Sequence, residues 1–116
     1  MKAALLVSHG SRSAAARKEV FALAARLGEQ SGLPVEIAFL DVEKPTIPEG
    51  LRVCVEEGAS EVVVLLNFLN SGMHVQEDIP KIIAEEKAKY PGVTFRLTPP
   101  IGTHAKIADL FADHLK

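Results

Sequence analysis

Cysteine and aromatic residues are scarce in this sequence. Its 116 residues include one cysteine, one tyrosine and no tryptophan. The single cysteine, Cys54, excludes a disulfide within the chain and a zinc site built from several cysteines. Because Cys54 lies in an apolar stretch with helical spacing, we expect a buried structural thiol.

The sequence also lacks an excess of charge and a long hydrophobic run. Its 13 Lys and Arg against 15 Asp and Glu give a net charge of −2, which argues against a nucleic-acid-binding surface. The apolar run 3–7 is too short for a secretory signal, and no run approaches the roughly 18 residues of a membrane span. We therefore expect a cytoplasmic protein with neither a nucleic-acid nor a membrane partner.

What is present is enough for a folded core. Hydrophobic residues make up 47% of the chain and charged residues 24%, a composition typical of globular proteins. For a mass of 12.5 kDa, area scaling predicts a folded surface of ~6,200 Å² against ~18,100 Å² unfolded. We expect residues 1–116 to form one domain.

Four apolar runs alternate with four helical patterns. The predicted strands are 3–7, 35–40, 62–66 and 93–97, the last stopped by Pro99 and Pro100. The predicted helices are 13–29, closed by Gly32; 48–57; 78–89, capped by Asp78; and 106–115. This alternation predicts an α/β fold with flavodoxin-like layering, in which helices cover both faces of an open parallel four-stranded sheet.

The strand patterns also predict the order of the sheet. Runs 3–7 and 62–66 are apolar on both sides, as interior parallel strands are, whereas 35–40 and 93–97 alternate like edge strands. Right-handed crossovers then give the order 2-1-3-4. Ligands of such sheets bind beyond the carboxyl ends of the strands where the winding direction reverses. The segments at that point are 8–12 and 69–74, and each contains a histidine.

His9 and His74 are the candidates for chemistry in this crevice. Imidazole has an unperturbed pKa of about 6.5, so it binds metal ions or takes up protons near neutral pH. Each histidine precedes a predicted helix, whose N-terminus favours the neutral ring. The alternative, that each one only caps a loop, stays open. His104 is better explained as a polar residue at a helix start, and His114 is given no role.

Helix N-termini at the same edge of the sheet offer unpaired N–H groups to an anion. The side chains that could assist are Ser11, Arg12, Lys44, Thr46 and Ser71, although Thr46 is better explained as a helix cap. Neither GxxxxGK[ST] nor GxGxxG occurs, so no nucleotide cofactor is expected.

Several segments resemble the small CbiX-type sirohydrochlorin chelatases, in order and with matching spacing along essentially the whole chain. They are HGSR at 9–12, KPTIP at 44–48, FLNSGMH at 68–74 followed by DIP at 78–80, and PIG at 100–102. Two positions depart from the family. Asn67 stands where the family often has Pro, and Lys44 stands where some members have an acidic residue.

The resemblance implies insertion of a divalent metal, Co²⁺ or Ni²⁺ and as a third candidate Fe²⁺, into sirohydrochlorin during tetrapyrrole cofactor biosynthesis, including that of cobalamin. It implies a homodimer in which each chain corresponds to half of the longer two-lobed class II chelatases. His9 and His74 would be catalytic, holding the metal and accepting pyrrole protons. The residues implied to contact the macrocycle are Ser11, Arg12, Lys44, Leu69, Asn70, Ser71, Gly72, Met73 and His74.

Two other functions stay open. The His9-Gly10 pair at a strand end also resembles phosphohistidine carriers of the mannose phosphotransferase type, which would use His9 alone. A non-catalytic carrier of a tetrapyrrole or a metal would have the same sequence features as a slow chelatase.

Overall fold

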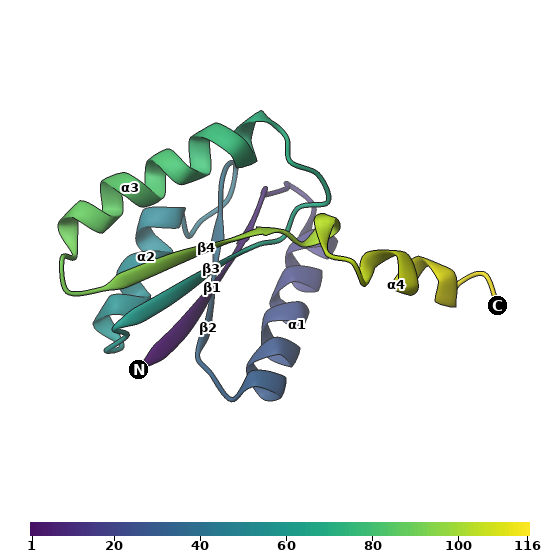
Figure 1. The fold of residues 1–116 in the computed structure, drawn as a ribbon, viewed down its shortest axis with the longest axis horizontal. Helices are drawn as coiled ribbons and strands as arrows, with labels where there is room; N and C mark the ends of the chain where they lie inside the picture. The colour runs from purple at the N-terminus through teal and green to yellow at the C-terminus, as the bar shows by residue number, and fades with distance from the viewer.

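A single parallel sheet organises the chain. The computed structural model describes residues 1–116, with the side chain of His74 excepted. The strands are β1 (Lys2–Ser8), β2 (Val35–Phe39), β3 (Glu61–Leu66) and β4 (Thr94–Pro100), in the order β2-β1-β3-β4 (Figure 1). The helices are α1 (Ala14–Ser31), α2 (Ile47–Glu56), α3 (Ile79–Lys89) and α4 (Ile107–Asp113), with short helical turns η1 (His74–Asp78) and η2 (Ile101–Thr103). The predicted fold class and strand order are confirmed.

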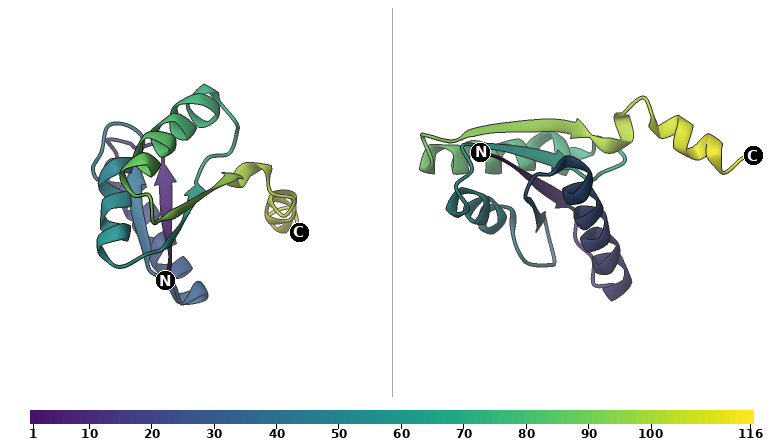
Figure 2. Two further views of the ribbon diagram at one scale, coloured as in Figure 1. Left: turned by 60° about the vertical axis from the view of Figure 1, so that its left-hand side comes forward. Right: turned by 90° about the horizontal axis from the view of Figure 1, so that it is seen from below.

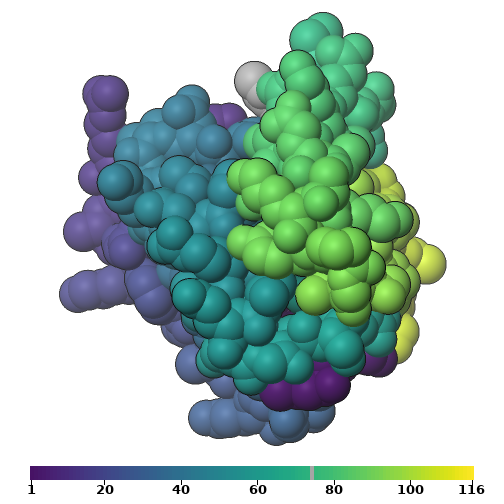
Figure 3. Space-filling view, turned by 90° about the vertical axis from the view of Figure 1, so that its left-hand side faces the viewer, coloured from purple at the N-terminus to yellow at the C-terminus, as the bar shows by residue number. Residues whose placement is uncertain are grey.

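One face of the sheet is covered by α2 and α3, which contact each other as well as the strands. Figure 3 views the molecule from this side, where both helices form the surface. The core beneath them takes alternate residues of the interior strands, such as Leu5, Val7, Val62 and Val64. Cys54 of α2 is fully buried in this core as predicted, and burial raises the pKa of its thiol to about 12.

The opposite face carries only α1 (Figure 1). A smaller core lies beneath it, formed by Leu6, Ala24, Ile37 and Phe39. Figure 2 shows α4 projecting beyond the end of β4, away from the sheet. The accessible surface is 7295 Å², about 1,100 Å² above the ~6,200 Å² that area scaling predicts. We call the face covered by α2 and α3 the closed face, and the face that carries α1 the open face.

The helix ends follow their sequence signals in two cases of three. Gly32 closes α1 with a left-handed φ of 70°. Thr46 caps α2 in a reciprocal capping box with Glu49, as predicted. The prediction that Asp78 caps the third helix is wrong. Its backbone is already helical, because the turn η1 runs into α3 without a break.

The prediction that Pro99 and Pro100 end the last strand is also wrong. β4 continues to Pro100, which pairs with Leu66 after a register shift. Proline is tolerated here because β4 is an edge strand, where an outward N–H has no partner strand to bond. Within the described residues, no helix is long and apolar enough to cross a membrane.

Candidate functional site

The loops that follow β1 and β3 meet at one edge of the sheet. These strands are parallel neighbours, and the winding direction reverses between them. A pocket of about 260 Å³ lies between the two loops. It is lined by His9, Phe68, Leu69, Asn70, Gly72 and Val75. The structure thus brings His9 together with three of the predicted contact residues.

Hydrogen bonds between the strand ends hold the two loops at a fixed separation. The Asn67 amide nitrogen Nδ2 donates to the buried hydroxyl of Ser8 at 3.0 Å, and the Asn67 backbone N–H donates to Val7. The following residue, Phe68, meets the exposed His9 ring edge-on, with centroids 6.4 Å apart. Asn67 and Phe68 therefore position the pocket. Sequence reasoning noted Asn67 only as a departure from the family.

The turn at Gly10 brings the first loop against the segment after β2. Gly10 has a φ of 108°, and a side chain there would overlap the carbonyl of Asp41. The Asp41 backbone N–H donates to the carbonyl of His9 at 2.9 Å. Glycine is needed at this position both for its conformation and for the close approach.

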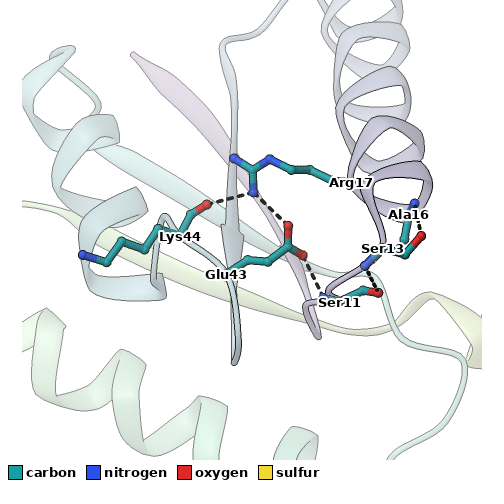
Figure 4. A network of polar contacts seen from close by, with 6 residues as sticks. All are labelled: Ser11, Ser13, Ala16, Arg17, Glu43 and Lys44. Carbon is teal, nitrogen blue, oxygen red and sulfur yellow. Dashed lines mark hydrogen bonds and ion pairs between the residues drawn. The ribbon is translucent and has the colours of Figure 1, made fainter.

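Glu43 fixes the other end of the same loop (Figure 4). Its carboxylate accepts from the Ser11 backbone N–H at 2.7 Å and from the Arg17 guanidinium at 2.9 Å. The Ser11 bond, followed by the Arg17 bond, lowers the pKa of Glu43. The Arg17 guanidinium also lies 5.0 Å from the Phe21 ring centroid. Sequence reasoning missed Glu43 and Arg17, although both flank predicted site segments.

The predicted cationic and hydroxyl residues lie around this loop. Ser11 accepts from the Ser13 backbone N–H through its hydroxyl, which keeps its own proton to donate to a ligand. Arg12 is exposed beside it. Lys44 is also exposed, and Figure 4 shows its ammonium pointing away from Ser11 and Glu43.

The second loop presents apolar and polar groups to solvent. Leu69 and Met73 are 63% and 71% exposed. The Ser71 carbonyl accepts from the Gln76 side chain at 2.9 Å, and the Gly72 carbonyl accepts from the Gln76 backbone. These bonds lead into η1, a π-helical turn of a kind frequent at functional sites. The side chain of His74, at the start of this turn, lies outside the described residues.

Gly102 supports the second loop from the end of β4. Its backbone N–H donates to the Phe68 carbonyl at 2.9 Å, and a side chain on Gly102 would overlap the backbone of Leu69. The nearby His104 instead accepts the Lys106 N–H ahead of α4, as expected of a residue at a helix start. His104 is not among the residues that line the pocket beside His9.

Among the described side chains, which exclude that of His74, no group of three or more His, Cys, Asp or Glu gathers to hold a metal ion.

The fold and the pocket define an open doubly wound α/β protein whose site lies at the switch point between β1 and β3. The sequence profile of the CbiX family matches residues 3–116. The chain belongs to this family.

Two curated relatives illustrate the similarity. The chain is 34% identical to the sirohydrochlorin cobaltochelatase of Priestia megaterium, over all of this chain and 38% of that protein. It is also 34% identical to the sirohydrochlorin ferrochelatase of Bacillus subtilis, over all of this chain and 45% of that protein. The chain thus spans less than half the length of both relatives.

Solved structures show the same fold. A putative cobalamin biosynthesis CbiX protein from Marinobacter aquaeolei superposes with a TM-score of 0.86 at 27% identity, over 99% of this chain and 92% of that one. The sirohydrochlorin chelatase SirB from Bacillus subtilis subspecies spizizenii, in complex with cobalt, gives 0.88 at 31% identity, over 98% of this chain and 49% of that one.

Proposed function

We propose that this protein is a sirohydrochlorin chelatase, a lyase that inserts Co²⁺ or Ni²⁺, with Fe²⁺ as a third candidate, into the macrocycle. The observation that carries the proposal is the pocket at the switch point, where His9 meets Leu69, Asn70 and Gly72. The relatives support the reaction, because their names assign cobalt or iron insertion into sirohydrochlorin.

The reaction exchanges two pyrrole N–H protons for one divalent metal ion. His9 and His74 are the proposed metal ligands and proton acceptors. Neutral imidazole suits both tasks, since it binds borderline ions such as Co²⁺ and Ni²⁺ and also acts as a base. The metal is a substrate here, delivered to the ring and released within the product.

The remaining predicted residues are proposed to hold the macrocycle. Exposed apolar side chains at Leu69 and Met73 suit the flat face of a tetrapyrrole, and Asn70 and Gly72 line the pocket beneath. The proposed partners for its carboxylates are Ser11, Arg12, Lys44 and Ser71. All of these lie in or beside the loops at the carboxyl edge of the sheet.

The active form is proposed to be a homodimer. The chain covers 38% to 50% of the first four curated relatives, whereas it covers 99% of a cobaltochelatase from Methanococcus aeolicus at 27% identity. A second copy of the chain would take the place of the half of the longer proteins that this chain does not match.

Metallation can be followed by the absorbance of sirohydrochlorin with Co²⁺, Ni²⁺ and Fe²⁺ offered separately. His9→Ala and His74→Ala are each expected to remove most of the enzymatic rate, about 100-fold or more for loss of a positioned base. Circular dichroism is expected to stay unchanged, because His9 is exposed and makes no part of the core. His114→Ala, at the exposed end of α4, is the matched control.

Near-wild-type rates in both histidine variants would overturn the assignment. Binding of sirohydrochlorin and metal without multiple turnover would instead indicate a carrier. Transfer of phosphate to His9, without tetrapyrrole binding, would indicate a phosphohistidine protein.

A further inference from the structure

The segments that follow β1 and β2 run side by side at the carboxyl edge of the sheet. The Leu40 N–H donates to the Ser8 carbonyl at 2.9 Å, and the Asp41 N–H donates to the His9 carbonyl at 2.9 Å. Both bonds use backbone groups, so they extend the pairing of the two parallel strands independently of the side chains. The backbone therefore fixes the loop between β1 and α1 as far as His9.

Beyond His9 a side chain holds this loop. Gly10 follows with a φ of 108°, and glycine restricts the direction of the chain less than any other residue does. The Ser11 N–H then donates to Oε2 of Glu43 at 2.7 Å. Because Glu43 belongs to the segment after β2, its carboxylate continues the attachment of the loop past the glycine turn.

The Glu43 carboxylate is itself held by Arg17 of α1 (Figure 4). Nη1 of Arg17 donates to Oε1 of Glu43 at 2.9 Å and to the Lys44 carbonyl at 3.1 Å. The guanidinium carbon lies 5.0 Å from the ring centroid of Phe21 and 5.4 Å from that of Phe39. The Glu43 side chain is 12% exposed, so water screens this charge-assisted bond less than a surface ion pair. Each carboxylate oxygen thus has its own partner.

We infer that Glu43 and Arg17 are positioning residues for the loop between β1 and α1. They fix Ser11 and Arg12, the proposed partners of macrocycle carboxylates, relative to His9, the proposed metal ligand. The inference rests on the proposed function, because insertion of the metal into a bound ring needs both sets of groups at a fixed separation. Neither Glu43 nor Arg17 is among the residues that line the pocket beside His9, so they act through the loop.

Steady-state metallation of sirohydrochlorin with Co²⁺ separates positioning from a loss of folded protein. In Glu43→Ala the loop is released at Ser11. The KM for sirohydrochlorin is therefore expected to rise about threefold or more, and kcat/KM to fall about tenfold or more. A smaller folded fraction would lower the apparent kcat alone, because the molecules that remain folded bind with the usual KM. Arg17→Met, which removes the guanidinium, is expected to raise the KM by less.

A conservative variant and a matched control sharpen this result. Glu43→Gln keeps an oxygen that accepts the Ser11 N–H but loses the charge that attracts Arg17. Its KM is expected to lie between those of Glu43→Ala and the unaltered protein. Glu56→Gln is the control, because it removes a carboxylate from an exposed ion pair on α2, 4.0 Å from Arg52. This variant is expected to leave KM and kcat unchanged.

The Ser11 amide reports on the same bond without any enzymatic activity. Nuclear magnetic resonance of nitrogen-15-labelled protein measures how fast this N–H exchanges with solvent. Loss of one hydrogen bond in Glu43→Ala is expected to speed the exchange about tenfold. The amide of Leu5, a fully buried residue of β1, is expected to keep its rate.

The outcomes distinguish this inference from the proposed function. An unchanged KM in Glu43→Ala, in a protein that otherwise metallates sirohydrochlorin, overturns the positioning role and leaves the chelatase standing. Unchanged exchange of the Ser11 amide in the same variant overturns the inference whatever the activity. Absence of metallation by the unaltered protein overturns the chelatase and this role together.

Discussion

The two faces of the sheet differ in how completely one chain covers them. On the closed face, α2 and α3 pack over a continuous core whose largest side chains are fully buried, among them Leu51 and Ile79. On the open face, α1 contributes Ala24, covers three buried strand residues and leaves an apolar groove beside it. The face under α2 and α3 thus holds most of the fully buried side chains, while the face under α1 leaves part of its apolar surface uncovered.

The largest effect is expected from truncating a side chain in the closed core. Leu51→Ala removes a side chain with 0% exposure and is expected to lower the free energy of unfolding by about 2–5 kcal/mol. Urea unfolding of dilute protein measures this. Leu23→Ala, in the groove at 36% exposure, is expected to cost less than half as much. Equal losses would show that the two faces are packed alike.

Substituting alanine for a helical glycine is expected to change the free energy of unfolding in opposite directions on the two faces. At Gly50 of α2, a new Cβ would lie 2.8 Å from Leu5 Cδ1 and 3.1 Å from Ala38 Cβ. We expect Gly50→Ala to destabilise the fold by about 1–3 kcal/mol through overpacking.

The matched variant is Gly28→Ala in α1. There the nearest atom would be 3.7 Å away, so the better helix propensity of alanine is expected to stabilise by about 0.5–1 kcal/mol. Thermal unfolding of both variants tests the pair. Stabilisation by Gly50→Ala would show that α2 does not pack closely on the sheet.

A smaller effect is expected from Glu43, which links the site loop to α1. Its folded pKa is lowered from the ordinary value of 4.5 by the Ser11 N–H and by Arg17. Its contribution to stability is therefore fully present above the unfolded pKa and is lost as the pH falls through the folded pKa. Glu43→Gln is expected to unfold with a weaker dependence on pH in this acidic range.

Unfolding curves measured from neutral pH down to below the folded pKa of Glu43 provide this comparison. Glu19→Gln, on the exposed side of α1, is the control and should keep the acid dependence of the unchanged protein. An acid dependence unaltered in Glu43→Gln would show that these hydrogen bonds do not stabilise the ionised carboxylate.

Much of the fold could be predicted from local patterns. The strands, their order and the cap at Thr46 follow from apolar periodicity and from short-range hydrogen bonds. The same patterns were wrong at Pro100 and Asp78. At Pro100 the strand continues because it pairs with β3, and at Asp78 the helix has already begun in the turn η1. Neither contact is contained in the local sequence.

The site could be predicted in part. The switch point follows from strand order and correctly brings His9 to the loop at Leu69 and Gly72. The Glu43 carboxylate and the Ser11 N–H lie 32 residues apart in sequence, so no local pattern indicates their contact. The composition of α4 likewise does not indicate that this helix projects beyond the end of β4.

The most direct test of the proposed function is multiple-turnover metallation of sirohydrochlorin by the unaltered protein. With sirohydrochlorin in excess over the protein, and Co²⁺ in excess over sirohydrochlorin, the protein is expected to produce several equivalents of metallated product per chain. The reaction is expected to be faster than the reaction without protein. His9→Ala is expected to lower this rate toward the background. Product formation that never exceeds the uncatalysed rate, with properly folded protein, would contradict the assignment of a chelatase site to the β1–β3 edge.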